Sequence, residues 1–148
     1  MYRLIDDITS FLESNGFVCS RQMRHGLEFI CTSSLDGRHE RMIFPLEIRA
    51  ADMEEAAERS EVISAAIVEA TREYGYPLII AEDRWNRQRS MMESRLLAHL
   101  EIFSQAYARN CEVRRIEKGE AAEFLTFCHS YGYASCRYHY GLFLKRHT

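Results

Sequence analysis

The sequence predicts an α/β protein in which a central mixed β-sheet is flanked by helices. The apolar run at 78–81 is short enough for a buried strand, and an amphipathic helix follows it directly. Segments 3–14 and 53–74 space their apolar residues as helices do, whereas 41–49 shows the two-residue period of a strand. Buried strands followed at once by helices are typical of α/β architecture.

Turn and capping residues separate the elements expected in the first part of the chain. Gly16 ends the first helix, Asp36-Gly37 joins the second and third strands as a hairpin, and Asp52 caps the next helix. Pro45 cannot donate a ladder hydrogen bond, so we expect it at a sheet edge or bulge. In chain order we expect a helix at 3–14, strands at 17–23, 27–32 and 41–49, a helix at 53–74, a strand at 77–82 and a helix at 86–104.

After Gln105 the character of the chain changes, and a C-terminal α+β extension is expected. Its elements, in chain order, are a strand at 107–116, a short helix at 118–127, an aromatic-rich segment at 129–140 and a terminal strand at 141–144. We therefore divide the chain into an α/β domain at 1–105 and an extension at 106–148. A terminal strand of this kind needs a partner strand or leaves an exposed sheet edge.

The composition is that of an ordinary globular protein, with 47% hydrophobic and 28% charged residues among 148. That length suits one domain with a short appendage. No apolar run reaches the length of a membrane span and the N-terminus lacks the apolar core of a signal peptide, so we expect no membrane partner. The five cysteines are odd in number and widely spaced, which suits reduced thiols and a cytoplasmic location.

Charge is distributed unevenly along the chain. Residues 1–83 carry 8 Arg or Lys against 16 Asp or Glu, whereas residues 84–118 carry 8 against 4. Arginine supplies 17 of the 19 cations, and its planar fork suits phosphate or carboxylate. The second half of the chain therefore suits an anionic partner. The alternative is a solvated helix face that docks on an acidic neighbour.

A candidate metal site lies on the second and third strands. Glu47 and Arg49 share one face of their strand by the two-residue period, and Glu28 lies on the neighbouring strand. Two carboxylates on paired strands could hold Mg²⁺ through oxygen. A cation beside them could stabilise a phosphoryl transition state or orient a water molecule. The alternative is that these residues form ordinary ion pairs on a half-solvated sheet.

The order helix, three strands, helix, strand, helix, with an acid-x-cation pattern on the third strand, resembles that of the PD-(D/E)xK restriction-endonuclease-like nucleases. The stretch IIAEDRWNRQRSMMESRLLAHL, followed by YARNCEVRRI, is similar to the end of such a domain in very-short-patch-repair and phage homing-associated endonucleases. The later stretch EAAEFLTFCHSYGYASCRYHYGLFL resembles the start of an N-acetyltransferase-like module. These likenesses cover about residues 76–144, and 1–75 only by element order.

The resemblance implies a DNA-acting, nuclease-like protein. Glu28 would stand for the family's first metal-binding acid, Glu47 for the acid of (D/E)xK, and Arg49 for its lysine. Arg49 cannot act as a base because arginine does not lose its proton, so whether the protein is an active enzyme stays open. Arg84, Arg87 and Arg89 would contact DNA phosphates.

The expected function is therefore Mg²⁺-dependent phosphodiester hydrolysis, or DNA binding by a degenerate relative, with no organic cofactor. The segment that resembles an acyltransferase is not followed by a Gly-rich loop for acyl-CoA, so we do not expect acyl transfer by this chain alone. The alternative function is a non-catalytic binding or assembly protein of the same fold that forms a homodimer through its C-terminal strand.

The aromatic-rich segment holds a second set of chemically suggestive residues. Cys128, His129, Cys136 and His139 are zinc-ligand types, but their spacing does not match paired zinc knuckles, and buried thiols with polar-tipped histidines are the alternative. Neighbouring tyrosines and Arg137 could stack on bases, although a core or interface cluster is the commoner use of such residues. These tyrosines are Tyr131, Tyr133, Tyr138 and Tyr140.

Overall fold

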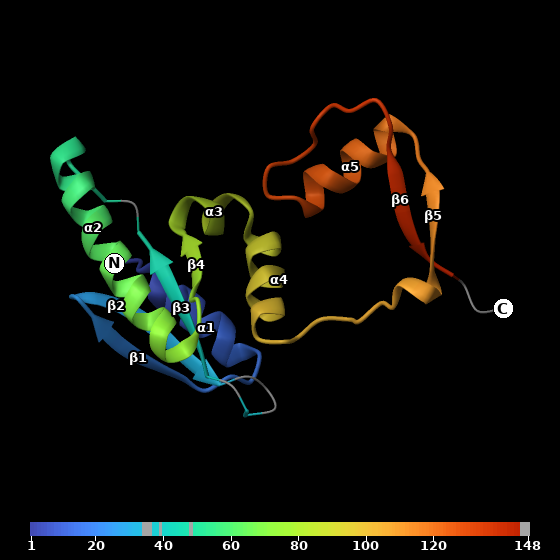
Figure 1. The fold of residues 1–148 in the computed structure, drawn as a ribbon. Coiled ribbons are helices and arrows are strands. Elements are labelled where there is room, and N and C mark those ends of the chain that lie inside the picture. Colours follow the sequence, from blue (N-terminus) through green and yellow to red (C-terminus); the bar gives the residue numbers. More distant parts are fainter. Residues whose placement is uncertain (34–36, 39, 48, 146–148) are drawn as a thin grey trace. The chain divides into compact units, whose positions relative to one another are not determined.

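The computed structural model describes residues 1–33, 37–38, 40–47 and 49–145, and it divides into two compact units, Met1–Ile102 and Phe103–Thr148 (Figure 1). Unit 1 contains, in chain order, α1 (Leu4–Ser14), β1 (Cys19–Arg24), β2 (Leu27–Ser33), β3 (Glu40–Leu46), α2 (Met53–Tyr74), β4 (Leu78–Ala81), α3 (Glu82–Arg87) and α4 (Arg89–His99). Unit 2 contains the short 3₁₀ turn Ala108–Asn110, β5 (Cys111–Arg115), α5 (Lys118–Cys128) and β6 (Tyr140–Leu144).

A four-stranded mixed sheet in the order β1-β2-β3-β4 forms the centre of unit 1. The first three strands form an antiparallel meander, and β4 runs parallel to β3. Two parallel strands need a crossover connection, and α2 supplies it. The prediction of a mixed sheet flanked by helices is therefore confirmed.

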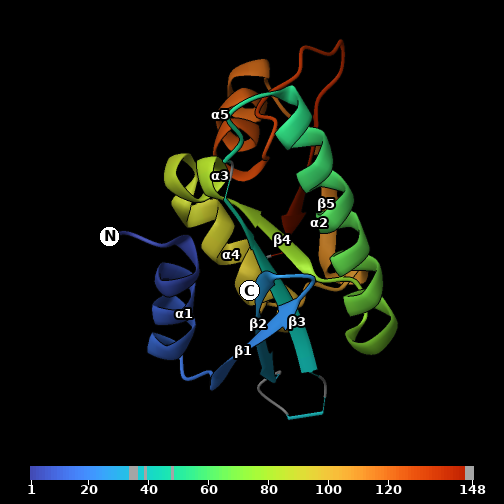
Figure 2. The same cartoon turned by 90° about the vertical axis from the view of Figure 1, so that its left-hand side faces the viewer.

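Helices cover both faces of this sheet (Figure 2). On one face, α1 and α4 pack against Ile30, Ile43 and Ile80 from three strands. On the other face, α2 packs against strand residues that include Met42 and Phe44. Because successive strand residues point to opposite faces, β3 contributes to both cores, as its two-residue period predicts.

Local signals set the limits of α2 where the sequence places them. The carboxylate of Asp52 accepts a hydrogen bond from the backbone N–H of Glu55 at 2.9 Å, which caps the first turn. Gly75 ends the helix with φ +78°, a conformation that other residues rarely adopt. The expected range 53–74 is confirmed.

Three elements show the largest departures from the prediction. The helix expected at 86–104 is two helices that begin at Glu82, break at Gln88 (φ −127°, ψ 45°) and end at His99. The third strand ends at Leu46 rather than at 49, so Glu47 and Arg49 follow the strand. In unit 2, the expected strand at 107–116 begins with a 3₁₀ turn and is a strand only over β5. Ile48 and Asp36 lie outside the described residues.

The two units divide between Ile102 and Phe103, close to the expected boundary after residue 105. Unit 2 has a two-stranded antiparallel sheet, β5 with β6, and one helix. Within the described ranges, no helix combines the length and the apolar character that crossing a bilayer requires.

Candidate functional site

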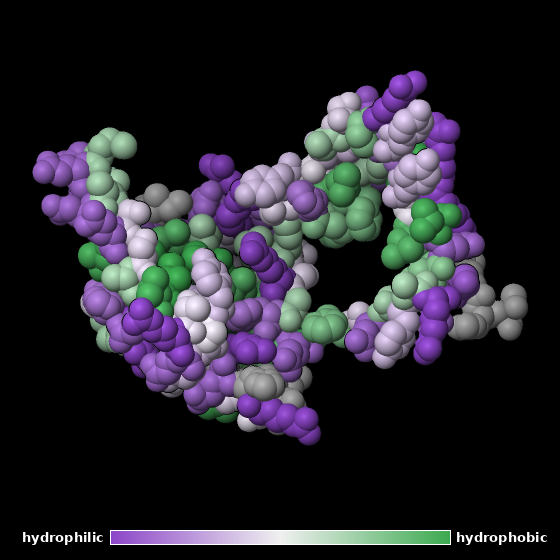
Figure 3. All heavy atoms as spheres, viewed as in Figure 1, coloured by the Kyte–Doolittle hydropathy of each residue, from purple (hydrophilic) through white to green (hydrophobic). Residues whose placement is uncertain are grey.

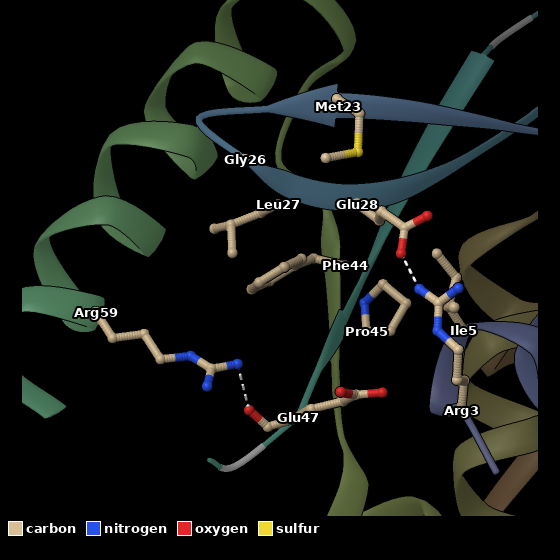
Figure 4. Close-up of a pocket in the computed structure, with 10 residues that line it drawn as sticks. All are labelled: Arg3, Ile5, Met23, Gly26, Leu27, Glu28, Phe44, Pro45, Glu47 and Arg59. Carbon is tan, nitrogen blue, oxygen red and sulfur yellow. Dashed lines mark hydrogen bonds and ion pairs between the residues drawn. The ribbon is translucent and has the colours of Figure 1, made fainter. Parts of the chain in front are cut away.

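A cleft of about 270 Å³ opens where β2 and β3 stop pairing (Figure 4). The antiparallel ladder between these strands runs from the pair Ser33–Glu40 to the pair Ile30–Ile43. Beyond Ile43, β3 pairs with β4, and Pro45 lies opposite Ile80. Proline has no N–H to donate to a ladder, so its position in the half of β3 that has left β2 follows from its chemistry.

Glu28 and Glu47, the two predicted metal-binding acids, both line this cleft. Glu28 is the second residue of β2, and Glu47 directly follows β3. Because β2 and β3 are antiparallel, the start of β2 and the end of β3 lie at the same end of the sheet. The register therefore brings together two acids that are far apart in the sequence.

The N-terminus of α1 contacts both carboxylates. The guanidinium group of Arg3 forms an ion pair with Glu28 (Figure 4), and Arg21 Nη1 lies 3.8 Å from Glu28 Oε1. The backbone N–H of Leu4 donates to Glu47 Oε1 at 3.3 Å. No side chain of its own caps α1, so Glu47 caps this helix from another element, where the helix dipole favours negative charge.

Arg59 of α2 holds the segment that follows β3. Its Nη2 donates to the carbonyl oxygen of Glu47 at 2.8 Å, and its Nη1 donates to the carbonyl oxygen of Arg49. Arg49 Nη2 lies 3.1 Å from Glu47 Oε2. The predicted acid and its predicted cation are therefore in contact, although the strand that was expected to align them ends before both residues.

The cleft and its immediate contacts carry more positive than negative charge. Three acids, Glu28, Glu47 and Asp6, stand against four cations, Arg3, Arg21, Arg49 and Arg59. Arg21 pairs more closely with Asp6 than with Glu28, and Arg59 donates to the carbonyl oxygens of Glu47 and Arg49 rather than to a carboxylate. A concave site with this balance suits a phosphate group, because guanidinium groups bind phosphate oxygens in a fork.

Sequence reasoning missed Arg3 and Arg59 as members of this site. Arg3 precedes the first helix, and Arg59 lies on the acidic first turns of α2. Neither arginine stands at a recognisable spacing from Glu28 or Glu47, because only the packing of α1 and α2 against the sheet brings them near. An isolated cation at the start of an amphipathic helix was the only local signal at Arg3.

The three arginines expected to contact DNA have different surroundings. Leu46, the last residue of β3, pairs with Ala81, the last residue of β4. Helix α3 starts at Glu82, so it begins at the same end of the sheet as Glu47. Arg84 Nη1 donates to Gln88 Oε1 at 3.1 Å, and Arg87 is exposed. These two side chains lie on the helix that begins at this end of the sheet, and neither lines the cleft.

Arg89 is engaged by partners within unit 1, although 41% of its side chain is exposed. Its guanidinium group donates to Asp7 at 2.7 and 3.1 Å and to Glu93 at 2.6 Å, and it stacks 4.0 Å from the ring centre of Trp85. The Trp85 indole N–H also donates to Asp7, at 2.8 Å. Hydrogen bonds from Arg89 lower the pKa of Asp7 to about 2, and the same contact raises the pKa of Arg89.

Trp85 is fully buried at the centre of this group. Its ring meets Phe11 of α1 edge to face, with ring centres 6.0 Å apart. Trp85 is therefore a packing anchor between α1 and α3.

The donor set of the cleft suits Mg²⁺ or Ca²⁺ rather than zinc. Glu28 and Glu47 supply hard oxygen ligands, and Mg²⁺ is commonly held by one or two carboxylates together with water and substrate phosphates. Across the described part of the chain, no group of three or more His, Cys, Asp or Glu side chains could hold a metal ion by itself. An ion at this cleft would therefore depend on oxygens from a substrate.

The cysteines and histidines of unit 2 have other contacts. Cys128 and Cys136 are exposed, which corrects the expectation of buried thiols. The Cys136 thiol donates to the carbonyl oxygen of Tyr138 at 3.2 Å, and His139 Nε2 lies 2.9 Å from the Tyr133 hydroxyl. The aromatic-rich segment is mostly exposed rather than packed as a core.

No family model matches the chain, and no curated protein or solved structure is significantly similar to it.

Proposed function

We propose that unit 1 binds DNA and hydrolyses phosphodiester bonds with Mg²⁺ held at Glu28 and Glu47. The observation that carries this proposal is the shared cleft: one carboxylate on β2 and one directly after the antiparallel β3 line one concave site at one end of a mixed sheet. The element order helix, three strands, helix, strand, helix also agrees with the restriction-endonuclease-like resemblance.

The residues of the cleft have separate roles in this proposal. Glu28 and Glu47 hold the ion, which supplies Lewis-acid stabilisation of phosphoryl charge. Arg3 pairs with Glu28 in the absence of DNA, and its guanidinium group can exchange the carboxylate for a phosphate oxygen. Arg21 bridges Glu28 and Asp6, with Asp6 as its closer partner. Arg49 stabilises negative charge beside Glu47 and does not act as a base.

Arg84 and Arg87 extend the phosphate-binding surface. They lie on α3, which begins at the end of the sheet where Glu47 lies. Contacts of this kind position the DNA backbone without reading its sequence. Arg89 acts indirectly in this proposal, because its ion pairs with Asp7 and Glu93 fix the junction of α3 and α4.

A degenerate, DNA-binding protein is the second candidate function. It is favoured by the arginine partners of both acids and by the arginine that stands where the related nucleases have a lysine. In this case Arg3 takes the place of the ion beside Glu28, and the cleft binds a phosphate without cleaving it.

Nicking of supercoiled plasmid DNA with Mg²⁺, Mn²⁺ or EDTA tests the proposal in wild type, Glu28→Gln and Glu47→Gln. Glutamine keeps an acceptor for the Leu4 N–H, so we expect Glu47→Gln to fold normally and to lose nicking. Glu123→Gln, which replaces an exposed acid in unit 2, is the matched control and should nick as wild type does.

Isothermal titration with Mn²⁺ gives a second readout that does not depend on cleavage. Wild type should bind the ion more tightly than either glutamine variant, while Glu123→Gln matches wild type. Equal nicking by wild type and both site variants would exclude the site. Absent nicking, together with DNA binding that EDTA does not change and that Arg3→Ala abolishes, would favour the degenerate candidate.

A further inference from the structure

Strand β6 of unit 2 has one paired edge and one edge without a strand partner. Across the described residues, β6 pairs with β5 alone, from Arg115–Tyr140 to Cys111–Leu144. Two-stranded sheets are marginally stable in water, and an apolar free edge invites a further strand. Leu142, in the middle of β6, is 67% exposed.

A cavity of about 450 Å³ runs along this free edge. Its lining includes the four consecutive residues 140–143 of β6. Consecutive strand residues point to opposite faces, so a cavity that touches four in a row follows the backbone edge rather than one face. Phe124 and Leu125 of α5 also line it, and Figure 3 shows hydrophobic surface over α5 and over the β5–β6 ribbon.

The chemistry of this groove suits an extended apolar segment. Residues of β6, which has an edge without a strand partner, and apolar residues of α5 line the groove together. At residue 141, a Cβ atom would lie 2.7 Å from the ring of Phe143, so a larger residue there would require that ring to move. A strand added to such an edge gains main-chain hydrogen bonds and buries alternate side chains.

We infer that the strand which fills this groove is β6 of a second copy of the chain, paired antiparallel across a two-fold axis. No residue of β6 is charged, so like strands can pair without repulsion. The other strand, β5, carries Arg114 and Arg115, and pairing of two β5 edges would bring arginines together.

The register of such a pair places opposite charges together. With Leu142 facing its own copy, Tyr140 lies opposite Leu144 of the second copy, and Lys145 of that copy reaches the Tyr140 end of the groove. That end is also where α5 begins, since the Ile116 N–H donates to the His139 carbonyl oxygen at 3.1 Å. Glu120, exposed on the first turns of α5, lines the groove there.

Two-fold symmetry repeats this contact, so each dimer holds two Glu120–Lys145 pairs. Lys145 Nζ donates to the carbonyl oxygen of Arg109 within its own chain at 3.2 Å, and this exposed hydrogen bond is exchanged when the dimer forms. The dimer is independent of the function proposed for the cleft of unit 1, because no residue of that cleft takes part.

Sedimentation equilibrium of the full chain over a range of concentrations tests the inference. Wild type should form a dimer, and Leu142→Asp should be monomeric. Glu120→Lys and Lys145→Glu should each weaken the dimer by about two- to twentyfold, since each change breaks two exposed ion pairs. The double variant Glu120→Lys with Lys145→Glu should restore the wild-type dissociation constant.

Glu123→Lys is the matched control, because Glu123 is exposed on the same helix and does not line the groove. It should dimerise as wild type does. A wild type that stays monomeric at every concentration would overturn the inference, and so would a dimer that both single charge changes leave unaltered. The double variant keeps the test decisive even if Leu142→Asp does not fold.

Discussion

The two units bury their apolar side chains to very different degrees. Nearly all buried hydrophobic residues among those described lie in unit 1, and Ala121 is the single one in unit 2. Ten of the eighteen exposed large hydrophobic residues described lie in unit 2, although it is the smaller unit. The difference reflects the number of layers: unit 1 covers both faces of its sheet with helices, whereas unit 2 has one helix for a two-stranded ribbon.

Unit 1 is stabilised by packing within the unit, whereas unit 2 leaves apolar surface that only another chain segment could bury. Unit 1 has two apolar layers that close around a sheet of four strands, so its elements support one another within the unit. Unit 2 leaves the free edge of β6 and much of the ribbon exposed, so further burial requires another chain segment. The three predictions below test this difference, from the largest expected effect to the smallest.

Replacement of Trp85 with alanine should lower the free energy of unfolding of unit 1 by about 3–5 kcal/mol, because it leaves a cavity in the core and removes a hydrogen bond to Asp7. Urea unfolding followed by circular dichroism measures the change. Phe127→Ala, a truncation of a large ring that is exposed in unit 2 and does not line the groove beside β6, should change stability by about 0.5 kcal/mol or less. Equal losses in the two variants would contradict the difference between the units.

Acid should weaken unit 1 through Asp7. Its folded pKa of about 2 lies below the ordinary value of 3.8, because Arg89 and Trp85 bond the carboxylate. The stabilisation is therefore present above about pH 4 and is lost as the pH falls toward 2. After screening by solvent, we expect it to amount to about 1–2 kcal/mol.

Urea unfolding of wild type and Asp7→Asn at about pH 5 and about pH 2 measures this contribution. The two proteins should differ at the higher pH and converge at the lower. Glu13→Gln, on the exposed side of the same helix, should behave as wild type at both. A difference between wild type and Asp7→Asn that persists at the lower pH would show that the charge of Asp7 is not its source.

The reactivity of the cysteine thiols should also differ between the two units, and this difference can be measured without changing the stability of the protein. Burial raises the pKa of the Cys31 thiol in the core of unit 1 and of the half-buried Cys19, which leaves less reactive thiolate. Cys128 and Cys136 in unit 2 are exposed. Brief treatment with iodoacetamide, followed by peptide mass spectrometry, should therefore modify the latter pair several-fold faster.

In urea all cysteines should react at similar rates, which serves as the control. Faster modification of Cys31 than of Cys136 in the native protein would mean that unit 1 opens more readily than its packing indicates.

Much of unit 1 could be predicted because its signals are local. The range of α2 follows from a cap at Asp52 and a glycine at its end, and each signal acts within a few residues. The alternation of Met42, Ile43 and Phe44 between two cores follows from the pleat of a strand. The break at Gln88 could not be predicted in this way, because the apolar spacing from Trp85 to Leu96 continues across it.

Some residues of the candidate site could be predicted from the sequence, and others could not. The sequence indicates Glu28, Glu47 and Arg49 as acids and a cation on neighbouring strands, and the structure places both acids in one cleft. It does not indicate Arg3 or Arg59, whose contacts with the site cross from α1 and α2 to the sheet. Nor does it show that Glu47 lies beyond its strand and caps α1.

By itself, the sequence of this protein determined the α/β class, most element limits and the faces on which apolar residues gather. These properties depend on backbone preferences and periodicities that act over one or two turns of chain. Only the tertiary structure decided where the ladder between β2 and β3 opens, which arginines meet the two acids, and which edge of unit 2 lacks a strand partner. Those features depend on register and on helix packing between segments far apart in the chain, which no local spacing specifies.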